Sequence, residues 1–509
     1  MKTSEDLFEL ISSLTRTEKG YFKKFTSMHV RGGENNYSRL FDAIEKQQSY
    51  DEKKIIKQFK EEKFTRQLSV AKNYLYNLIL ESLESYHSTV ESKLNSLIHQ
   101  IDILFKKRLY HQAEKILASS KKTALEYEKH LHYLLLIQRE LLLISAMRYA
   151  GKTEEELKGL FKKVFVEVER ANNLFQFWQL NSLTYFKMKI GGGFIRSEAD
   201  KKLFEEIIKN PLMVSPESAT DFLSAFFYNS CHIGYNFSSR NFDKMYEHCV
   251  MQSKLIENNL HLAEELPQAR INHLLNLSIA QMALKKYNEV PGTVELIRNC
   301  AASSEHIAIL IYEQANTIEM EYLITTGQFE KALRLFELVE KKFSEAKQQV
   351  LQPHQMPMVY FYKAVVLFAL GRLRESAKLL NQGLNESGLD YRNDLHCFAK
   401  IFSLVVHYEL GNQDLLDHMI RSTYRYLLKR NRLYKFETVV INYIRKNMPE
   451  SNSNAELLSA FTSLKNEIVE LTKDPFEKSA LELFDYVSWL ESKLNNKSYE
   501  DMVRQRAGI

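Results

Sequence analysis

Residues that break helices are scarce in this chain of 509 residues, which contains only 16 glycines and 8 prolines. No segment rich in proline, glycine or serine divides the chain, so flexible linkers between separate domains are not expected. Runs that alternate strictly between apolar and polar residues are also absent, which argues against β-strands. Leu, Lys, Glu and Ala recur at helical spacing instead, and the composition therefore predicts an all-α protein.

Cysteine, long apolar runs and a strong net charge are lacking too. The apolar stretch at 133–147 is broken by Gln138, Arg139 and Glu140, so it is too short and too charged to cross a bilayer. A net charge of +5 is too weak to indicate nucleic-acid binding by the whole chain. We expect a cytoplasmic protein without membrane association. Neither a disulfide framework nor a zinc knuckle is expected, because the four cysteines lie far apart in the sequence: Cys231, Cys249, Cys300 and Cys397.

A short pattern of residues returns at intervals of about 43 residues. Its clearest copy holds Gly327, Phe329, Ala332 and Phe336. Glycine suits the left-handed end of a first helix, the alanine lets two helices cross closely, and Phe336 packs against the neighbouring helix. Related copies begin at Arg108, Arg240, Lys285 and Gly371, and weaker turns fall at Gly151, Gly191 and Gly411. Each interval has room for two helices, and Pro291 predicts a kink or a late helix start in its copy.

The pattern at Gly327 resembles the tetratricopeptide repeat family, in which a glycine turn, an aromatic residue and an alanine recur in each helix pair. The period is longer than the family's usual value of about 34 residues, which implies longer helices. The resemblance covers roughly residues 91–448. It implies a right-handed α-solenoid of antiparallel helix pairs, with the first helix of each pair on the inner surface.

Two further segments flank this array. Residues 1–90 carry no repeat and are predicted to form a helical head, with helices that begin near Thr17, Asn36, Asp51 and Thr65 and a loop at 31–34. Residues 449–509 are predicted to cap the last repeat with helices at about 454–473 and 476–495. The predicted organisation is therefore head 1–90, array 91–448 and cap 449–509.

Motifs that carry chemistry are weak in this sequence. Residues 146–153 fit a loose phosphate-loop pattern, but the preceding residues are helical in pattern, so we interpret them as a turn between helices. His130 and His132 would point to different faces of a helix, and the triple glycine at 191–193 lacks the spacing of a dinucleotide site. No catalytic frame is recognisable. We therefore expect a protein that is not an enzyme and has no cofactor or metal.

The favoured function is a non-catalytic interaction scaffold that binds a peptide or a partner helix in the groove of the array. The register of Gly327 predicts a mixed polar and aromatic groove formed by Asn272, Leu275, Gln314, Thr317, Glu321, Phe361 and Tyr408.

A basic segment at 421–446 has eight cationic residues against the single acid Glu437. Arg421, Arg425, Lys429 and Arg432 are spaced to form one stripe on a helix. Such a stripe could hold phosphate or an acidic peptide, and it could equally be a solvated outer face.

The alternative function is a transcriptional regulator in which the head binds DNA and the array senses a ligand. The two helices predicted at 51–59 and 66–83 have helix-turn-helix proportions. A bundle that caps the first repeat explains them equally. In a DNA reader the bases would be contacted by Arg66, Gln67, Ser69, Lys72 and Asn73.

Overall fold

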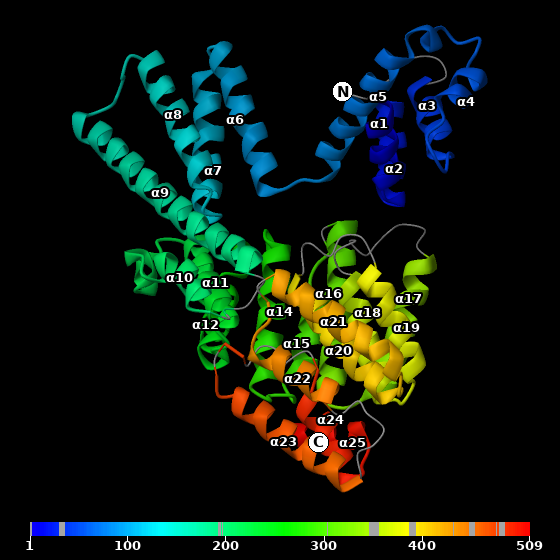
Figure 1. Ribbon diagram of the computed structural model, residues 1–509. Helices are drawn as coiled ribbons and strands as arrows, with labels where there is room; N and C mark the ends of the chain where they lie inside the picture. Colours follow the sequence, from blue (N-terminus) through cyan, green and yellow to red (C-terminus); the bar gives the residue numbers. More distant parts are fainter. Residues whose placement is uncertain are drawn as a thin grey trace. The chain divides into compact units, whose positions relative to one another are not determined.

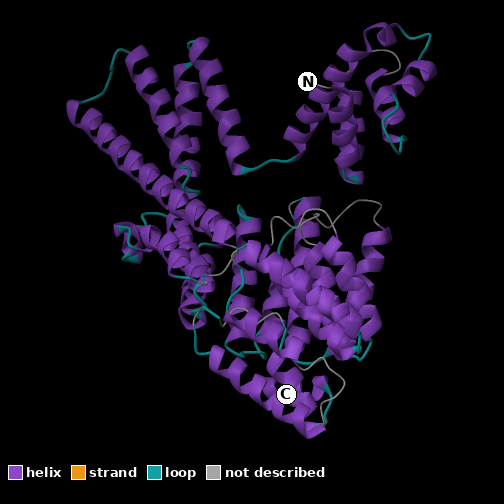
Figure 2. Cartoon of the chain, in the orientation of Figure 1, coloured by secondary structure: helices purple, strands orange, loops and turns teal. Residues whose placement is uncertain are grey.

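The computed structural model describes residues 3–29, 36–191, 195, 197–302, 304–345, 356–385, 393–430, 432–446, 454–474, 476–477 and 484–509. Throughout these residues the regular structure is helical and no strand occurs, which confirms the all-α prediction (Figure 2). None of the described helices is long and apolar enough to span a membrane. The predicted loop at 31–34 and the predicted boundary at 448–449 fall outside the described residues.

The chain divides into two compact units, Met1–Val168 and Glu169–Ile509, and each is described by itself. In the first unit, residues 3–86 enclose a core of their own that includes Leu7, Phe22, Phe41 and Leu75. Rings of Phe22 and Phe41 lie 4.7 Å apart at its centre. This core is formed by α1 (Thr3–Ser13), α2 (Arg16–His29), α3 (Asn36–Glu45), α4 (Glu52–Gln58) and α5 (Leu68–Tyr86).

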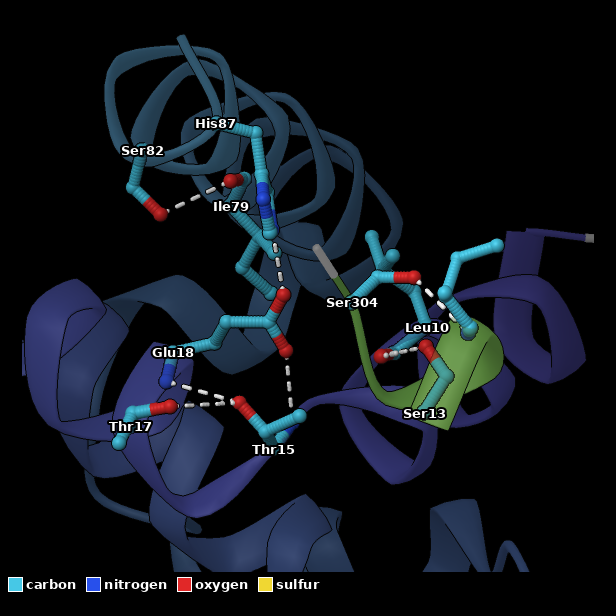
Figure 3. Close-up of polar contacts among 10 residues, drawn as sticks. Leu10, Ser13, Thr15, Thr17, Glu18, Ile79, Ser82, His87 and Ser304 are labelled. Carbon is cyan, nitrogen blue, oxygen red and sulfur yellow. Dashed lines mark hydrogen bonds and ion pairs between the residues drawn. The ribbon is translucent and has the colours of Figure 1, made fainter. Parts of the chain in front are cut away.

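Reciprocal hydrogen bonds fix the start of α2 and tie it to the end of α5 (Figure 3). Thr15 Oγ1 accepts from the Glu18 N–H at 3.1 Å, and Glu18 Oε2 accepts from the Thr15 N–H at 2.7 Å. The other oxygen of Glu18 lies 2.5 Å from His87 Nε2. Burial opposes ionisation of Glu18, but these hydrogen bonds outweigh it and lower its pKa. The cap is thus Thr15, two residues before the predicted Thr17.

The rest of the first unit is a set of antiparallel helices that pack in chain order. α6 (Val90–Lys106), α7 (Tyr110–Glu126) and α8 (His130–Ala146) contact one another, and α9 (Glu154–Gly191) begins after them (Figure 1). A second core holds them together. Arg139 of α8 binds both carboxylate oxygens of Asp102 on α6 at 3.1 Å, which sets the register of these two helices.

From α11 (Phe222–Ser238) onward each helix of the second unit contacts the next, and helices two apart also touch, as in α14 (Pro267–Ala283) with α16 (Glu305–Thr325) and α18 (Met356–Ala369) with α20 (Asn393–Glu409). This is the arrangement of a stack of helix pairs, and it confirms the predicted array. The hand of its superhelix stays a prediction. The helices of the stack are α10 (Glu198–Ile208), α11 (Phe222–Ser238), α12 (Phe242–Asn258), α13 (Leu260–Glu264), α14 (Pro267–Ala283), α15 (Val290–Arg298), α16 (Glu305–Thr325), α17 (Phe329–Glu345), α18 (Met356–Ala369), α19 (Leu373–Asn385), α20 (Asn393–Glu409), α21 (Gln413–Lys429) and α22 (Lys435–Lys446).

Turns at the predicted register share one backbone geometry. The residue after the helix has a positive φ, and the N–H that follows it bonds to a carbonyl five residues earlier, as Gln328 does to Leu323 at 2.7 Å. Positive φ values occur at Gly327, Gly371 and Gly411 and also, at 57° to 60°, at the non-glycine positions Arg108, Arg240 and Lys285. The register read from the sequence is therefore confirmed. Within the clearest copy, Phe329, Ala332 and Phe336 are buried.

The repeats depart from the predicted pattern at α9 and follow it at α15. The turns predicted at Gly151 and Gly191 are not separated by a helix pair, because α9 runs through the interval as one helix of 38 residues. The turn that closes α8 has positive φ values at Arg148, 56°, and at the predicted Gly151, 70°. Pro291 lies in the first turn of the nine-residue α15, which starts only at Val290, so the predicted late helix start is confirmed.

The C-terminal segment folds back onto the array. It comprises α23 (Asn454–Leu471), α24 (Tyr486–Asn495) and α25 (Tyr499–Ala507), which lie close together in Figure 1. Glu409 of α20 accepts from Trp489 Nε1 at 2.7 Å and from Lys493 Nζ at 2.5 Å. Arg504 Nε donates to the Gly327 carbonyl at 2.9 Å. The segment therefore covers the last helices and also reaches the turn between α16 and α17. The domain limits 1–90, 91–448 and 449–509 stay predictions.

Candidate functional site

Five of the predicted groove residues lie on two neighbouring first helices of the stack. Gln314, Thr317 and Glu321 follow one another along α16, each half-buried, and Asn272 and Leu275 lie on α14. α14 and α16 pack against each other. Leu275 packs against the core that the two helices share. We call these five residues the polar face.

The polar face has hydrogen-bonding capacity left over. Within the described residues the side chains of Gln314 and Thr317 have no hydrogen-bond partner, and Asn272 is exposed. Glu321 Oε1 accepts from Tyr362 Oη of α18 at 2.8 Å, so the face continues onto the next first helix. An amide and a hydroxyl that are half-buried and not used internally can donate to and accept from a peptide backbone.

The other two predicted groove residues lie elsewhere. Phe361 is 2% exposed and belongs to the core, where its ring lies 5.7 Å from that of Phe402. Tyr408 is half-buried in the contact with the C-terminal segment, and its ring lies 6.5 Å from that of Trp489. The residue of α18 that does reach the polar face is Tyr362. The apolar pattern of α18 does not single it out, because Tyr362 packs partly against the same core and Val366, one turn later, is fully buried.

The basic stripe is shorter than predicted. Arg421, Arg425 and Lys429 are exposed on α21, but Arg432 follows the end of that helix and donates to Tyr434 Oη at 3.3 Å. Arg421 forms an ion pair with Asp417, one turn away. The stripe is therefore a three-residue patch on the surface of the second helix of its pair, with part of its charge balanced.

Aromatic and cationic side chains gather beneath this patch. Tyr426 lies between the His396 ring, 4.8 Å away and nearly parallel, and the Arg430 guanidinium, 3.9 Å from its centroid. Burial lowers the pKa of His396 to about 4. It also lowers the pKa of Lys400, whose ammonium lies 4.8 Å from the Tyr426 ring. The cluster packs α20 against α21, which is a structural role.

The candidate DNA-reading residues of the head are not presented together. Lys72 is 4% exposed, with Nζ 2.5 Å from Glu52 Oε2 and 3.2 Å from Tyr50 Oη. An ammonium bound in this way is not available to a phosphate. Arg66 and Gln67 belong to a 3₁₀ turn, η1 (Lys63–Gln67), ahead of α5, while Ser69 and Asn73 are exposed on α5 itself. Capture of Lys72 by Glu52 of α4 could not be read from the sequence spacing.

The weak chemical motifs have structural roles. The phosphate-loop pattern at 146–153 forms the turn between α8 and α9, and Thr153 caps α9 by accepting from the Glu156 N–H at 3.2 Å. His130 Nδ1 lies 2.8 Å from Glu167 Oε2 in a buried contact between α8 and α9, while His132 is on another face. Gly192 and Gly193 lie outside the described residues. Within the described part of the chain, no three His, Cys, Asp or Glu residues are grouped to hold a metal.

Comparison with solved structures found proteins of similar fold. No protein-family model and no curated protein matches the chain. Among solved structures, the chain is similar to one described as "Crystal Structure of Rap Protein Complexed with Competence and Sporulation Factor". The two are 12% identical, with 82% of this chain and 99% of that chain covered and a TM-score of 0.41.

Proposed function

We propose that the chain is a non-catalytic interaction scaffold whose polar face binds an extended peptide segment of a partner protein. The observation that carries the proposal is the pair Gln314 and Thr317, half-buried on α16 without a hydrogen-bond partner in the described residues. A backbone amide of a bound peptide offers one donor and one acceptor, which matches the donor and acceptor of each side chain.

The neighbouring side chains define what such a segment needs. Leu275 offers an apolar contact beside the amide of Asn272, and Glu321, held by Tyr362, gives the far end of the face a negative charge. The segment we expect is therefore extended, with an apolar side chain near Leu275 and a basic residue near Glu321.

The test begins with affinity purification from native cells and continues with a measured affinity. A partner captured by the wild-type chain is titrated by calorimetry against Gln314→Ala/Thr317→Ala. Loss of two hydrogen bonds predicts an affinity lower by about 10- to 100-fold. The control is Gln112→Ala on α7, an exposed glutamine of the first unit.

The comparison has a clear negative outcome. A partner that binds the double variant and the wild type equally well uses another surface, and the polar face is then not the binding site. The DNA-binding alternative gains nothing from the structure, because Lys72 is occupied by Glu52. A gel-shift titration at low salt in which Arg66→Ala weakens binding, and Gln112→Ala does not, would restore it.

A further inference from the structure

A hollow lies between α25, the turn after α14 and the C-terminal end of α16. It has a volume of about 210 Å³ and opens to solvent. Apolar side chains line its interior, among them Ile324, Val365, Phe484 and Val503. Two cationic side chains, Lys285 and Arg506, stand at its edge. An apolar cavity of about 150 Å³ is large enough to bind benzene, so the hollow has room for a small organic molecule.

The wall formed by α25 is held firmly in place. The Tyr499 ring stacks on Phe484 at 5.4 Å and on Phe329 at 5.7 Å. Tyr499 is buried, and burial raises its pKa well above the usual value. Arg504 adds the hydrogen bond to the Gly327 carbonyl at 2.9 Å. The hollow is therefore a preformed feature between packed elements.

The opposite edge is the turn after α14. Lys285 occupies the left-handed position of that turn, with φ 57°, and is exposed. Its ammonium donates to the Arg506 carbonyl at 3.0 Å. This partner is a neutral oxygen, so the positive charge of Lys285 is not cancelled by the contact.

The one carboxylate in the lining is already occupied. Asp485 Oδ1 accepts from the Ser488 N–H at 3.0 Å and from Arg506 Nη1 at 3.1 Å, and Oδ2 accepts from Ser488 Oγ at 2.5 Å. With two cations and one anion, the lining carries a net positive charge beside several apolar side chains. That combination selects a molecule with one negative charge at the end of an apolar body.

We infer that this hollow binds a small monocarboxylate with an apolar body, its carboxylate paired with Lys285 and its body against Ile324, Val365 and Val503. The same chemistry is presented by a free acid of medium chain length and by the C-terminus of a peptide that ends in an apolar residue. The site is independent of the proposed scaffold function, since it shares none of the five residues of the polar face.

The experiment uses the full-length chain and calorimetric titration with three probes. Octanoate represents the free acid, acetyl-Phe-Leu with a free carboxylate represents the peptide end, and octanamide is the uncharged control. We expect at least one carboxylate to bind about tenfold more tightly than octanamide. Whichever carboxylate binds more tightly identifies the source. Equal binding of all three probes, or none, overturns the inference.

Two variants locate the binding. Lys285→Met removes the ammonium and should lower the affinity for the bound carboxylate about tenfold, to the level of octanamide. Arg108→Met is the matched control, because it removes an exposed cation from the equivalent left-handed turn in the first unit. Ala507→Phe keeps both cations but fills the hollow, so it should abolish binding. Unchanged affinity in Lys285→Met and Ala507→Phe places the probe elsewhere and refutes the site.

Discussion

Glycine at the turn of a helix pair serves two separate purposes in this chain. Gly327 and Gly371 both have a positive φ, 67° and 73°, which a residue with a Cβ adopts only with strain. Around Gly371 a Cβ would meet nothing within 4 Å, whereas at Gly327 it would lie 2.7 Å from Arg504 Cγ. Gly327 is therefore needed both for its backbone conformation and for close contact with α25.

Replacement of each glycine by alanine should separate the two effects. Gly371→Ala is expected to lower the free energy of unfolding by about 1 kcal/mol through backbone strain alone. Gly327→Ala adds overpacking against α25 and should cost about 1–3 kcal/mol more. Urea denaturation of the two variants measures the difference. Equal losses would mean that α25 does not rest on this turn.

Non-glycine residues in left-handed turns offer the reverse test. Arg108 is exposed with φ 60°, so Arg108→Gly relieves strain without loss of packing and should stabilise by about 1 kcal/mol. Arg240 has a similar φ of 58°, but its guanidinium lies over the rings of Phe237 and Phe242 at 4.9 and 5.5 Å. Arg240→Gly should therefore not stabilise. Thermal unfolding of both variants decides the point.

At the scale of the elements, buried hydrogen bonds connect α11, α12 and α14. His273 is 3% exposed, with Nδ1 2.8 Å from Gln252 Oε1 and Nε2 2.9 Å from Ser253 Oγ. Nδ1–H can donate to the amide oxygen while Nε2 accepts from the hydroxyl, an arrangement that fits the neutral ring. Burial, with Arg270 nearby, lowers the pKa of His273 to about 4.

This histidine should make the second unit sensitive to acid. The unfolded chain takes up the proton near pH 6.5 and the folded chain only near pH 4, so stability falls as the pH drops between these values. One such residue changes the free energy of unfolding by at most about 1.4 kcal/mol per pH unit. Urea midpoints at pH 7.5 and 5.0 measure it. His273→Gln should flatten the pH dependence, and an unchanged dependence in that variant contradicts the assignment.

How far the elements could be predicted depended on local signals. Turns with glycine, and the late start of α15 at Pro291, follow from backbone preferences of single residues. α9 was missed because the pattern gave a turn at each end of its interval, and nothing in the pattern fixed how many helices lay between them. Phe361 was misplaced because one offset along the repeat was applied to every first helix, whereas α18 is buried on most of its surface, including Val365 and Val366.

On the scale of the whole molecule, the two units have separate cores and should unfold as separate transitions. Calorimetry is expected to show two unfolding transitions. Phe41→Ala removes a ring from the core of the first unit and Trp489→Ala one from that of the second, each at a cost of about 3–5 kcal/mol. Each variant should lower the temperature of one transition and leave the other unchanged. A single transition that shifts in both variants would show that the units unfold together.

Contacts between distant parts of the chain lay beyond what the sequence could predict. The repeat register was enough to place Gln314, Thr317 and Glu321 on one helix, because all three lie on α16. The contact of α25 with Gly327 joins residues 177 positions apart, a separation that the repeat does not predict. The same holds for the capture of Lys72 by Glu52, because pairing of charges depends on how helices pack and not on their spacing.

The return of the last helix to the middle of the stack bears on how the protein is made in the cell. Tyr499 and Val503 emerge during synthesis long after the turn at Gly327 that α25 contacts, yet both are buried in the larger unit. Domains generally fold as units during translation, the N-terminal one first. The smaller unit can therefore complete its fold on the ribosome, while the larger one must wait, with apolar surface uncovered, until α25 has emerged.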